Sequence, residues 1–543
     1  MSAASSASTS AAGAVIDPWA PLRRPVFRLL WITGVMANVC SWMYEVAAAW
    51  TMATAPGATP LLVALVQTAA TAPVFLFALP SGALADIIDR RRYLIFSQSW
   101  VALVSIALAT LSLTGNLTSG LLFASAFLMG TGLAMRLPTF ASLIQDVVPR
   151  AEIAGAVVLY GVALNASRVV GPVIAGAIVA LGGTGYVFVL NTLLSVAGIF
   201  FLLRWPRQAP PPGKLPSERF IGAIRVGIQF ARNTPALLAV LVRGAVCAFF
   251  GAAPLAMLPV VARVHLSGGP TTYSLLVACF GLGALVLAMC VGKIRKHISR
   301  DQLVIAAWVL SALATAVVGV SHNPYVVGLA MLGAGFAWTA AFGAFQVAAQ
   351  MALPRWVGGR GLALVLMALW VGMALGGAAW GQLATSTSLS TSLLTAALTS
   401  LIGLFATLHL KLEEHGKEDL TPSPRRELSL AMPIGPQQGP VLVTVEYRTD
   451  PARAGEFLLL MQESRRMRLR NGALSWSIFQ DLANAGEFVE QFVDESWLAH
   501  LRHRERATAA EREIQNRKLA FHVCETAPRV RYFLGVEVPD EPS

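Results

Sequence analysis

The sequence predicts an all-α polytopic membrane protein with twelve transmembrane helices in two six-helix halves, followed by a small α+β domain. Composition is the first reason. Of 543 residues, 55% are hydrophobic and only 13% are charged, whereas soluble chains carry about 25% charged residues. The second reason is that apolar runs recur between residues 27 and 411, each long enough to cross ~30 Å of hydrocarbon as a helix. The third is a change of character after residue 440, where charges return and apolar and polar residues alternate.

Charged, Gly-rich or Pro-rich breaks divide the apolar region into individual segments. The predicted spans are 27–52, 60–84, 93–114, 118–143, 153–181, 184–204, 236–261, 271–292, 301–320, 324–350, 359–384 and 389–411. The expected parts of the chain are a disordered cytoplasmic N-terminus (1–26), a first half (27–205), a cytoplasmic linker with an amphipathic helix (206–235), a second half (236–411), a second linker (412–439) and a cytoplasmic α+β domain (440–538).

Positive charge alternates between successive connections. One set of connections holds nearly all of the Lys and Arg residues, and the other holds only Arg263. Because basic loops stay on the cytoplasmic side, both termini are expected in the cytoplasm, with the protein in the bacterial inner membrane. This topology accounts for most of the net charge of +12, so nucleic acid is not expected as a partner.

A dense cluster of charges separates the second and third spans, in Gly82-Ala-Leu-Ala-Asp86-Ile-Ile-Asp89-Arg90-Arg91-Arg92. Such a cluster cannot lie in hydrocarbon, so it is predicted to be a short turn at one membrane face. The pattern resembles the loop between helices 2 and 3 of the major facilitator superfamily, although Ile87 and Asp89 replace a common arginine and glycine. The resemblance implies a secondary transporter with the major facilitator fold.

The same resemblance implies a gating motif of Gly82, Asp86, Arg90 and Asp146. In it, Asp86 faces the start of helix 11 at Gly358-Gly-Arg-Gly361, and Arg90 pairs with Asp146. A carboxylate at a helix N-terminus contributes about 1 kcal/mol, up to ~2. The alternative is that the loop is solvated and acts only as a topology signal.

The fifth span carries Gly171-Pro172-x-x-x-Gly176, and the eleventh span repeats the pattern as Gly376-Gly377-x-x-x-Gly381. Parallel halves with a substrate site between them are typical of facilitators. Gly171, Pro172 and Gly176 also resemble part of an antiporter motif. Close helix packing by small residues explains the same pattern equally well.

Charges inside the predicted spans are few and therefore informative. Glu45 is the only acidic residue in the interior of a predicted span, and Asn38 lies seven positions earlier on the same face. A carboxyl group in a low-dielectric environment is suited to load and release a proton, so Glu45 is the candidate for proton coupling. The alternative is an ion pair with Arg136 or Arg168. Arg243, early in the seventh span, is expected to reach the cytoplasmic interface.

Further polar and aromatic residues are expected to line a central substrate cavity, although tryptophans in such helices also serve as packing or interface anchors. The candidates are Asn38, Trp42, Gln67, Arg136, Asn165, Arg168, Trp338, Gln346 and Gln350.

Residues 440–538 are predicted to form strands 441–447, 474–480, 487–493 and 530–536 with helices 451–469 and 496–519. The order β-α-β-β-α-β is the ferredoxin-like pattern, and the stretch resembles the antibiotic-biosynthesis-monooxygenase type of domain. That resemblance implies dimerisation through this domain. Trp476, Trp497, His500 and His503 show no spacing that indicates a catalytic site, so a regulatory or dimerising tail is expected.

Taken together, the chain resembles the transmembrane secretion effector family, which is similar to exporters of the siderophore enterobactin. The resemblance rests on Phe27-Arg-Leu-Leu-Trp31, on Asn38 with Ser41-Trp42-Met43, on the Asp86 loop and on Asn165-x-x-Arg168-Val-Val-Gly171-Pro172. It implies a proton-driven exporter of siderophore-like or drug-like small molecules. A membrane-tethered enzyme and an importer are the alternatives.

Neither a cofactor nor a metal ion is expected. The five cysteines lack metal-ligand spacing, and the sequence has no G-x-x-x-x-G-K-[S/T] motif for ATP. The expected partners are therefore a small-molecule substrate, protons and the lipid bilayer.

Overall fold

The computed structural model describes residues 19–87, 89–149, 152–205, 220–354, 356–412, 423 and 434–536. The side chains at 78–79, 82–83, 85–87, 137–138, 140–146, 153–154, 157 and 220–224 lie outside this description. The chain divides into two compact units. The first unit comprises residues 1–215, 244–344 and 367–408, and the second comprises 216–243, 345–366 and 409–543.

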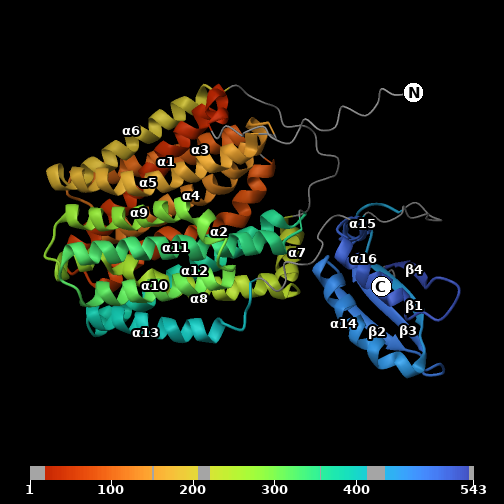
Figure 1. Cartoon of the computed structure of the whole chain (residues 1–543). Helices are drawn as coiled ribbons and strands as arrows, with labels where there is room; N and C mark the ends of the chain where they lie inside the picture. Colours follow the sequence, from red (N-terminus) through yellow and green to blue (C-terminus); the bar gives the residue numbers. More distant parts are fainter. Residues whose placement is uncertain are drawn as a thin grey trace, which may run out of the picture. The chain divides into compact units, whose positions relative to one another are not determined.

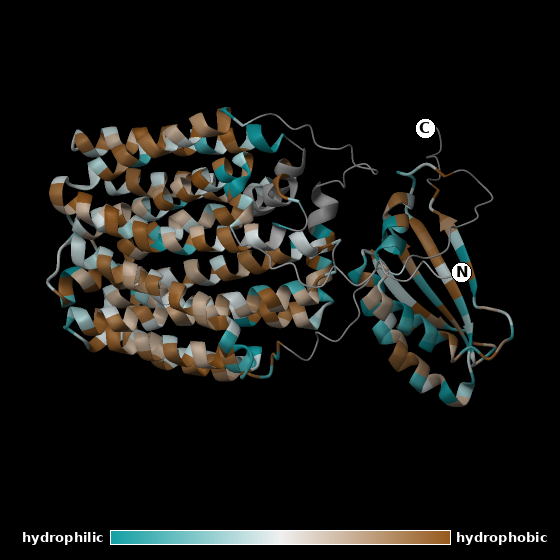
Figure 2. Ribbon diagram, turned by 45° about the horizontal axis from the view of Figure 1, so that its top comes forward, coloured by the Kyte–Doolittle hydropathy of each residue, from teal (hydrophilic) through white to brown (hydrophobic). Residues whose placement is uncertain are grey.

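Within the described residues, twelve helices are long and apolar enough to cross a membrane, as the sequence predicts. They run side by side in Figure 1, and Figure 2 shows hydrophobic residues along their length. Their bounds are α1 (Pro25–Thr54), α2 (Pro60–Ile87), α3 (Arg90–Leu113), α4 (Ser119–Val147), α5 (Ile153–Gly182), α6 (Thr184–Leu203), α8 (Pro235–Val260, extended by a π-helical turn Val261–His265), α9 (Pro270–Ile294), α10 (Arg300–Val320), α11 (Pro324–Ala352), α12 (Gly358–Ser386) and α13 (Leu389–Thr407). The predicted amphipathic helix between the halves is α7 (Phe220–Arg232).

Helix starts follow local chemistry. Several helices begin at a proline, which lacks the N–H group that the first turn leaves unpaired. Others begin after a Ser or Thr whose hydroxyl accepts from the first turn, as Ser299 accepts from Gln302 in a capping box. Asp89 caps α3 in the same way, because its carboxylate accepts from the Arg92 N–H at 3.1 Å. This explains an aspartate at a position where the resembled motif has glycine.

The predicted repeat appears in the structure as equivalent glycine contacts on α5 and α12. On α5, a side chain at Gly171 would overlap Trp42 of α1, and one at Gly176 would overlap Ser274 of α9. On α12, a side chain at Gly376 would overlap the carbonyl of Phe249 on α8, and one at Gly381 would overlap Ala64 of α2. In each helix the first glycine therefore packs against its own half and the later glycine against the other half.

The contacts between the halves cluster toward the ends of the helices that are remote from the Arg90–Arg92 turn. The Leu61 N–H donates to Thr385 Oγ1 at 3.0 Å, and Arg263 donates to the Ala53 carbonyl. The rings of Trp50 and Tyr273 stack with centroids 6.1 Å apart. The two halves thus close against each other at this end of the bundle.

The last part of the chain forms a four-stranded antiparallel sheet in the order β2-β3-β1-β4. The elements are β1 (Val441–Arg448), α14 (Ala454–Arg470), β2 (Ser475–Gln480), β3 (Glu487–Asp494), α15 (Trp497–Glu505), α16 (Ala509–Leu519) and β4 (Arg529–Leu534). The predicted order of strands and helices is observed. One prediction is wrong: the single helix 496–519 is two helices, because Thr508 and Glu511 form a capping box that starts a new one.

The core of this sheet domain contains charge. In β3, alternate residues face inward, so Glu490 and Asp494 lie on the same face as Phe488 and Phe492. Glu490 is fully buried and is paired with Lys518 Nζ at 3.0 Å and Arg468 Nε at 3.3 Å. It also accepts hydrogen bonds from three neutral side chains, those of Tyr447, Ser464 and Trp476. Although burial alone would raise the pKa of Glu490, these two cations and the hydrogen bonds hold the pKa below its usual range.

Candidate functional site

Glu45 lies where three helices of the first half meet. Gln67 Nε2 of α2 donates to Glu45 Oε1 at 3.2 Å. Arg168 of α5 interacts electrostatically with Glu45. In the described part of the chain, no Arg168 nitrogen lies within 4.0 Å of a Glu45 oxygen, and Arg168 Nε is buried without a hydrogen-bond acceptor. The two opposite charges therefore interact electrostatically without forming a contact ion pair.

Aromatic rings hold the Arg168 guanidinium. Its Cζ atom lies 5.1 Å from the ring centroid of Trp42 and 5.9 Å from that of Phe280 on α9. A cation over an aromatic face is stabilised by about 0.5–2 kcal/mol. The backbones of α5 and α9 approach closely here, since a Cβ at Gly281 would lie 2.9 Å from the Arg168 carbonyl oxygen. Arg168 is thus fixed at the boundary between the two halves.

Phe280 was not among the residues identified from sequence. In an apolar run it carries no signal of its own, because its contact with Arg168 depends on how α5 and α9 pack.

A second polar group lies beside this cluster. Arg136 Nη2 of α4 lies 3.5 Å from Ser41 Oγ, which is one turn before Glu45 on α1. The Asn38 side chain is 5% exposed, and its Nδ2 has no acceptor among the described residues. Asn165 Nδ2 donates to the Gly161 carbonyl of its own helix at 2.9 Å. Arg136 and Arg168 therefore have different surroundings, and Arg168 is the one that faces Glu45.

Three of the other predicted cavity residues lie on α11. Trp338 stacks on Phe342 with centroids 6.2 Å apart and packs against Gly251 of α8. Gln346 and Gln350 belong to the second unit and are described separately from the first. The central cluster therefore consists of Trp42, Glu45, Gln67, Arg168 and Phe280.

This arrangement of a polar cluster inside a twelve-helix bundle of two repeated halves is accompanied by a match along nearly the whole chain. The family model described as "Transmembrane secretion effector" matches residues 16–540. The chain belongs to the transmembrane secretion effector family. It is therefore a membrane transporter of the major facilitator type and not an enzyme, and it crosses the membrane several times.

One relative is an uncharacterised MFS-type transporter, YfiS, of Bacillus subtilis (strain 168). The transporter is 27% identical to it over 385 residues, which cover 67% of this chain and 89% of the relative.

Solved structures of other transporters share the fold. A POT family transporter in complex with 5-aminolevulinic acid matches with a TM-score of 0.59 and 12% identity, over 72% of this chain and 96% of that one. A bacterial homologue of the human lysosomal transporter Spinster, inward-facing and unoccupied, matches with a TM-score of 0.55 and 14% identity, over 72% of this chain and 97% of that one. These likenesses establish the fold of the membrane part.

The proposed gating motif of the transporter is only partly visible. The side chains of Gly82, Asp86 and Asp146 lie outside the described residues. Arg90 begins α3 directly after the Asp89 cap. The pairing of Arg90 with Asp146 and the position of Asp86 remain predictions.

Arg243 of the transporter lies inside the protein, and its extension to the cytoplasmic interface stays a prediction. Its side chain is 1% exposed, and Nη1 donates to the Leu410 carbonyl at 3.2 Å. The guanidinium satisfies the carbonyl of a chain end that follows α13. Arg243 thus acts as a buried hydrogen-bond donor.

The tail of the transporter contains a buried cluster that its spacing in sequence did not indicate. His500 Nδ1 and His503 Nδ1 lie 2.7 and 3.0 Å from the two carboxylate oxygens of Asp494. Trp497 stacks on His500 with centroids 5.3 Å apart. The sequence analysis did not include Asp494 with these histidines. The alternation of buried residues in β3 was the signal that could have placed Asp494 on the inward face. Trp476 lies elsewhere and donates to Glu490.

Burial alone would raise the pKa of Asp494, but the two histidines outweigh burial and hold the pKa below its usual range. Within the described residues, no group of three or more His, Cys, Asp or Glu side chains could hold a metal ion.

Proposed function

We propose that this transporter is a proton-driven secondary active exporter of siderophore-like or drug-like small molecules across the bacterial inner membrane. The observation that carries the proposal is the Glu45–Gln67–Arg168 cluster. It places a carboxyl group and a guanidinium at the boundary between two halves that must rearrange during transport.

The cluster suits an exchange of proton and substrate. Protonation of Glu45 removes a negative charge that faces Arg168 and leaves the hydrogen bond from Gln67 with a weaker acceptor. While Glu45 is ionised, its carboxylate can bind a cationic or hydrogen-bond-donating substrate group, and protonation releases that group; Trp42 and Phe280 offer aromatic surface beside it. Siderophores and many drugs combine an aromatic body with such polar groups. In this scheme the proton and the substrate compete for the Glu45 carboxylate, which is the requirement for antiport.

The closed end of the bundle supports access of the substrate to the central cluster from the opposite end. The inter-half contacts of Leu61, Arg263 and Trp50 lie away from the arginine-rich turn at Arg90–Arg92. With the basic turn in the cytoplasm, these contacts close the periplasmic end. An exporter in this state is accessible to substrate from the cytoplasm.

Glu45→Gln tests the proposal, because glutamine keeps the size and hydrogen bonding of the side chain but cannot carry a proton. In everted vesicles incubated with a panel of catecholate and hydroxamate siderophores and cationic dyes, proton-driven uptake of the wild-type substrate is expected to be lost. Downhill exchange of that substrate is expected to remain. Asp301→Asn, which removes an acid at the start of α10, is the matched control and is expected to retain both activities.

The alternative role for Glu45 is a purely structural charge partner of Arg168. A structural pair predicts that the double variant Glu45→Gln/Arg168→Gln recovers uphill transport, because no uncompensated charge remains. Coupling predicts that the double variant stays inactive in uphill transport. Uphill transport at the wild-type rate and pH dependence in Glu45→Gln would refute the coupling role. Substrate uptake by right-side-out vesicles, with none by everted vesicles, would favour an importer.

A further inference from the structure

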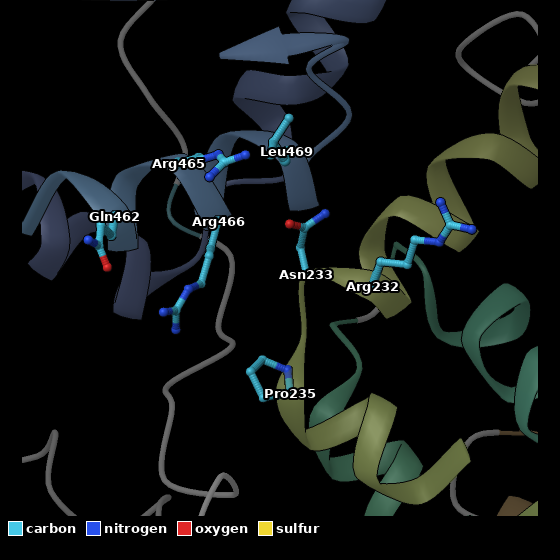
Figure 3. Close-up of a pocket in the computed structure, with 7 residues that line it drawn as sticks. All are labelled: Arg232, Asn233, Pro235, Gln462, Arg465, Arg466 and Leu469. Carbon is cyan, nitrogen blue, oxygen red and sulfur yellow. The ribbon is translucent and has the colours of Figure 1, made fainter. Parts of the chain in front are cut away.

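A cavity of about 500 Å³ lies between α14 and the segment that joins α7 to α8 (Figure 3). It belongs to the second unit alone. The side chains around it come from two stretches of chain more than 200 positions apart. They are Arg232, Asn233, Pro235, Gln462, Arg465, Arg466 and Leu469.

The arginines of this cavity differ from their neighbours on α14. Arg468 and Arg470 point into the sheet domain and are paired with the buried carboxylates of Glu490 and Glu511. Arg465 and Arg466, together with Arg232 of α7, have no carboxylate oxygen within 4.0 Å anywhere in the described chain.

The nearest acid in sequence does not neutralise them. Glu463 is engaged by both terminal nitrogens of Arg517, at 2.9 and 3.2 Å. The described residues that line the cavity therefore include three arginines and two side-chain amides and no acid, which is the composition expected of an anion site.

We infer that this cavity is a binding site for a phosphate-bearing anion. Guanidinium groups form paired, charge-assisted hydrogen bonds that match the geometry of phosphate oxygens, and Asn233 and Gln462 supply further donors. The volume lies within the ~300–1,000 Å³ typical of small-molecule sites. It is large enough for a phosphate with an attached group such as glycerol.

The position along the chain adds a second argument. Pro235 is both a wall of the cavity and the first residue of α8, a membrane span. A basic pocket at the end of a span lies near the depth of lipid headgroups and is suited to anionic lipids. A lipid headgroup and a soluble phosphate ester offer the same chemistry to this cavity.

The test uses the full-length transporter purified in a neutral detergent. Isothermal titration is performed with dihexanoyl-phosphatidylglycerol, with glycerol 3-phosphate and with dihexanoyl-phosphatidylcholine. Comparing the two anions distinguishes a lipid headgroup from a soluble phosphate ester as the ligand. The zwitterionic lipid is expected not to bind. The variants are Arg465→Gln/Arg466→Gln on α14 and Arg232→Gln on the opposite wall. The control is Lys293→Gln/Lys296→Gln, which removes the same charge as the first variant from the end of α9 and the turn that follows it.

Binding of phosphatidylglycerol alone, weakened about tenfold or more by both cavity variants and unchanged in the control, supports a lipid headgroup site. Equal binding of glycerol 3-phosphate with the same pattern of losses supports a soluble phosphate ester. The proposal is overturned if neither anion binds, or if the cavity variants weaken binding no more than the control. Thermal unfolding of each variant confirms that a loss of binding is not a loss of fold.

Discussion

At the scale of single residues, the transporter places charge in two kinds of environment. Glu490 and Asp494 are enclosed by partners that fully compensate them. Glu45 and Arg168 face each other at the boundary of the halves without a contact ion pair. A compensated charge stabilises one structure, whereas a partly compensated one can exchange partners. The same residue types therefore serve structure in the tail and are proposed to serve mechanism in the membrane.

Asp494→Asn is expected to destabilise the tail by about 1–3 kcal/mol at pH 7, because asparagine keeps only one acceptor oxygen for two buried histidines. The wild-type contribution depends on pH with a definite sign. The pKa of Asp494 is lowered in the folded chain, so its contribution is complete well above the unfolded value of about 3.9 and is lost as the pH falls below it.

The measurement is the urea dependence of cleavage within residues 434–536 of the full-length protein, with thermolysin at pH 7 and pepsin at low pH. Glu463→Gln, which removes an exposed pair with Arg517, is the control and is expected to cost less than about 1 kcal/mol. Equal midpoints for Asp494→Asn and the control would show that the histidine contacts contribute little.

At the scale of elements, paired glycines set how closely helices of opposite halves approach. Gly176 meets Ser274, and Gly381 meets Ala64, in equivalent positions of the two repeats. At these two positions the interface is built from backbone and small side chains, which pack closely without interdigitating. Such a surface can open without unthreading long side chains.

Gly176→Val is expected to oppose closure of the halves at this end, because its side chain would overlap Ser274. Overpacking costs about 1–3 kcal/mol, which changes the ratio of two conformations about five- to 150-fold. The readout is labelling of Thr68→Cys by an impermeant maleimide from the outside, with the five native cysteines replaced by alanine. Faster labelling is expected.

Gly161→Val lies on the same helix and meets nothing within 4 Å, so it is the matched control. If both valine variants label at the same rate, the glycine contact does not set the closure.

At the scale of the whole molecule, the distribution of basic residues predicts the orientation. Reporter fusions after Arg92 and after Gly439 are expected to lie in the cytoplasm, and a fusion within residues 114–119 on the opposite side. Alkaline phosphatase and a fluorescent protein as complementary reporters measure this. Phosphatase activity at Gly439 would exclude an even number of spans before the tail.

The sequence was sufficient for features that depend on one segment at a time. Twelve spans, the α7 helix and the strand order of the tail follow from length, hydropathy and alternation, which are local properties. Contacts between segments were harder to predict from the sequence. Nothing in the spacing links Gln67 to Glu45 or Phe280 to Arg168, because these pairs depend on how helices rotate and tilt when they pack.

The missed break between α15 and α16 has a different cause. Charged residues continue through both helices, so periodicity gives no boundary there. The Thr508–Glu511 capping box was a local signal that the sequence did contain.

The position of Lys518 has a consequence for biosynthesis. The twelve spans precede the tail in the chain, so they leave the ribosome before it. Glu490 then stays without its Lys518 partner, and β1 keeps one open edge, until residues 518–534 have been made. A chain that stops short of this point has Arg468 beside Glu490 but lacks Lys518, so one of the two cationic partners of this buried carboxylate is missing. Because a buried charge with incomplete partners is destabilising, we expect the tail to reach its full stability only after the last strand has been made.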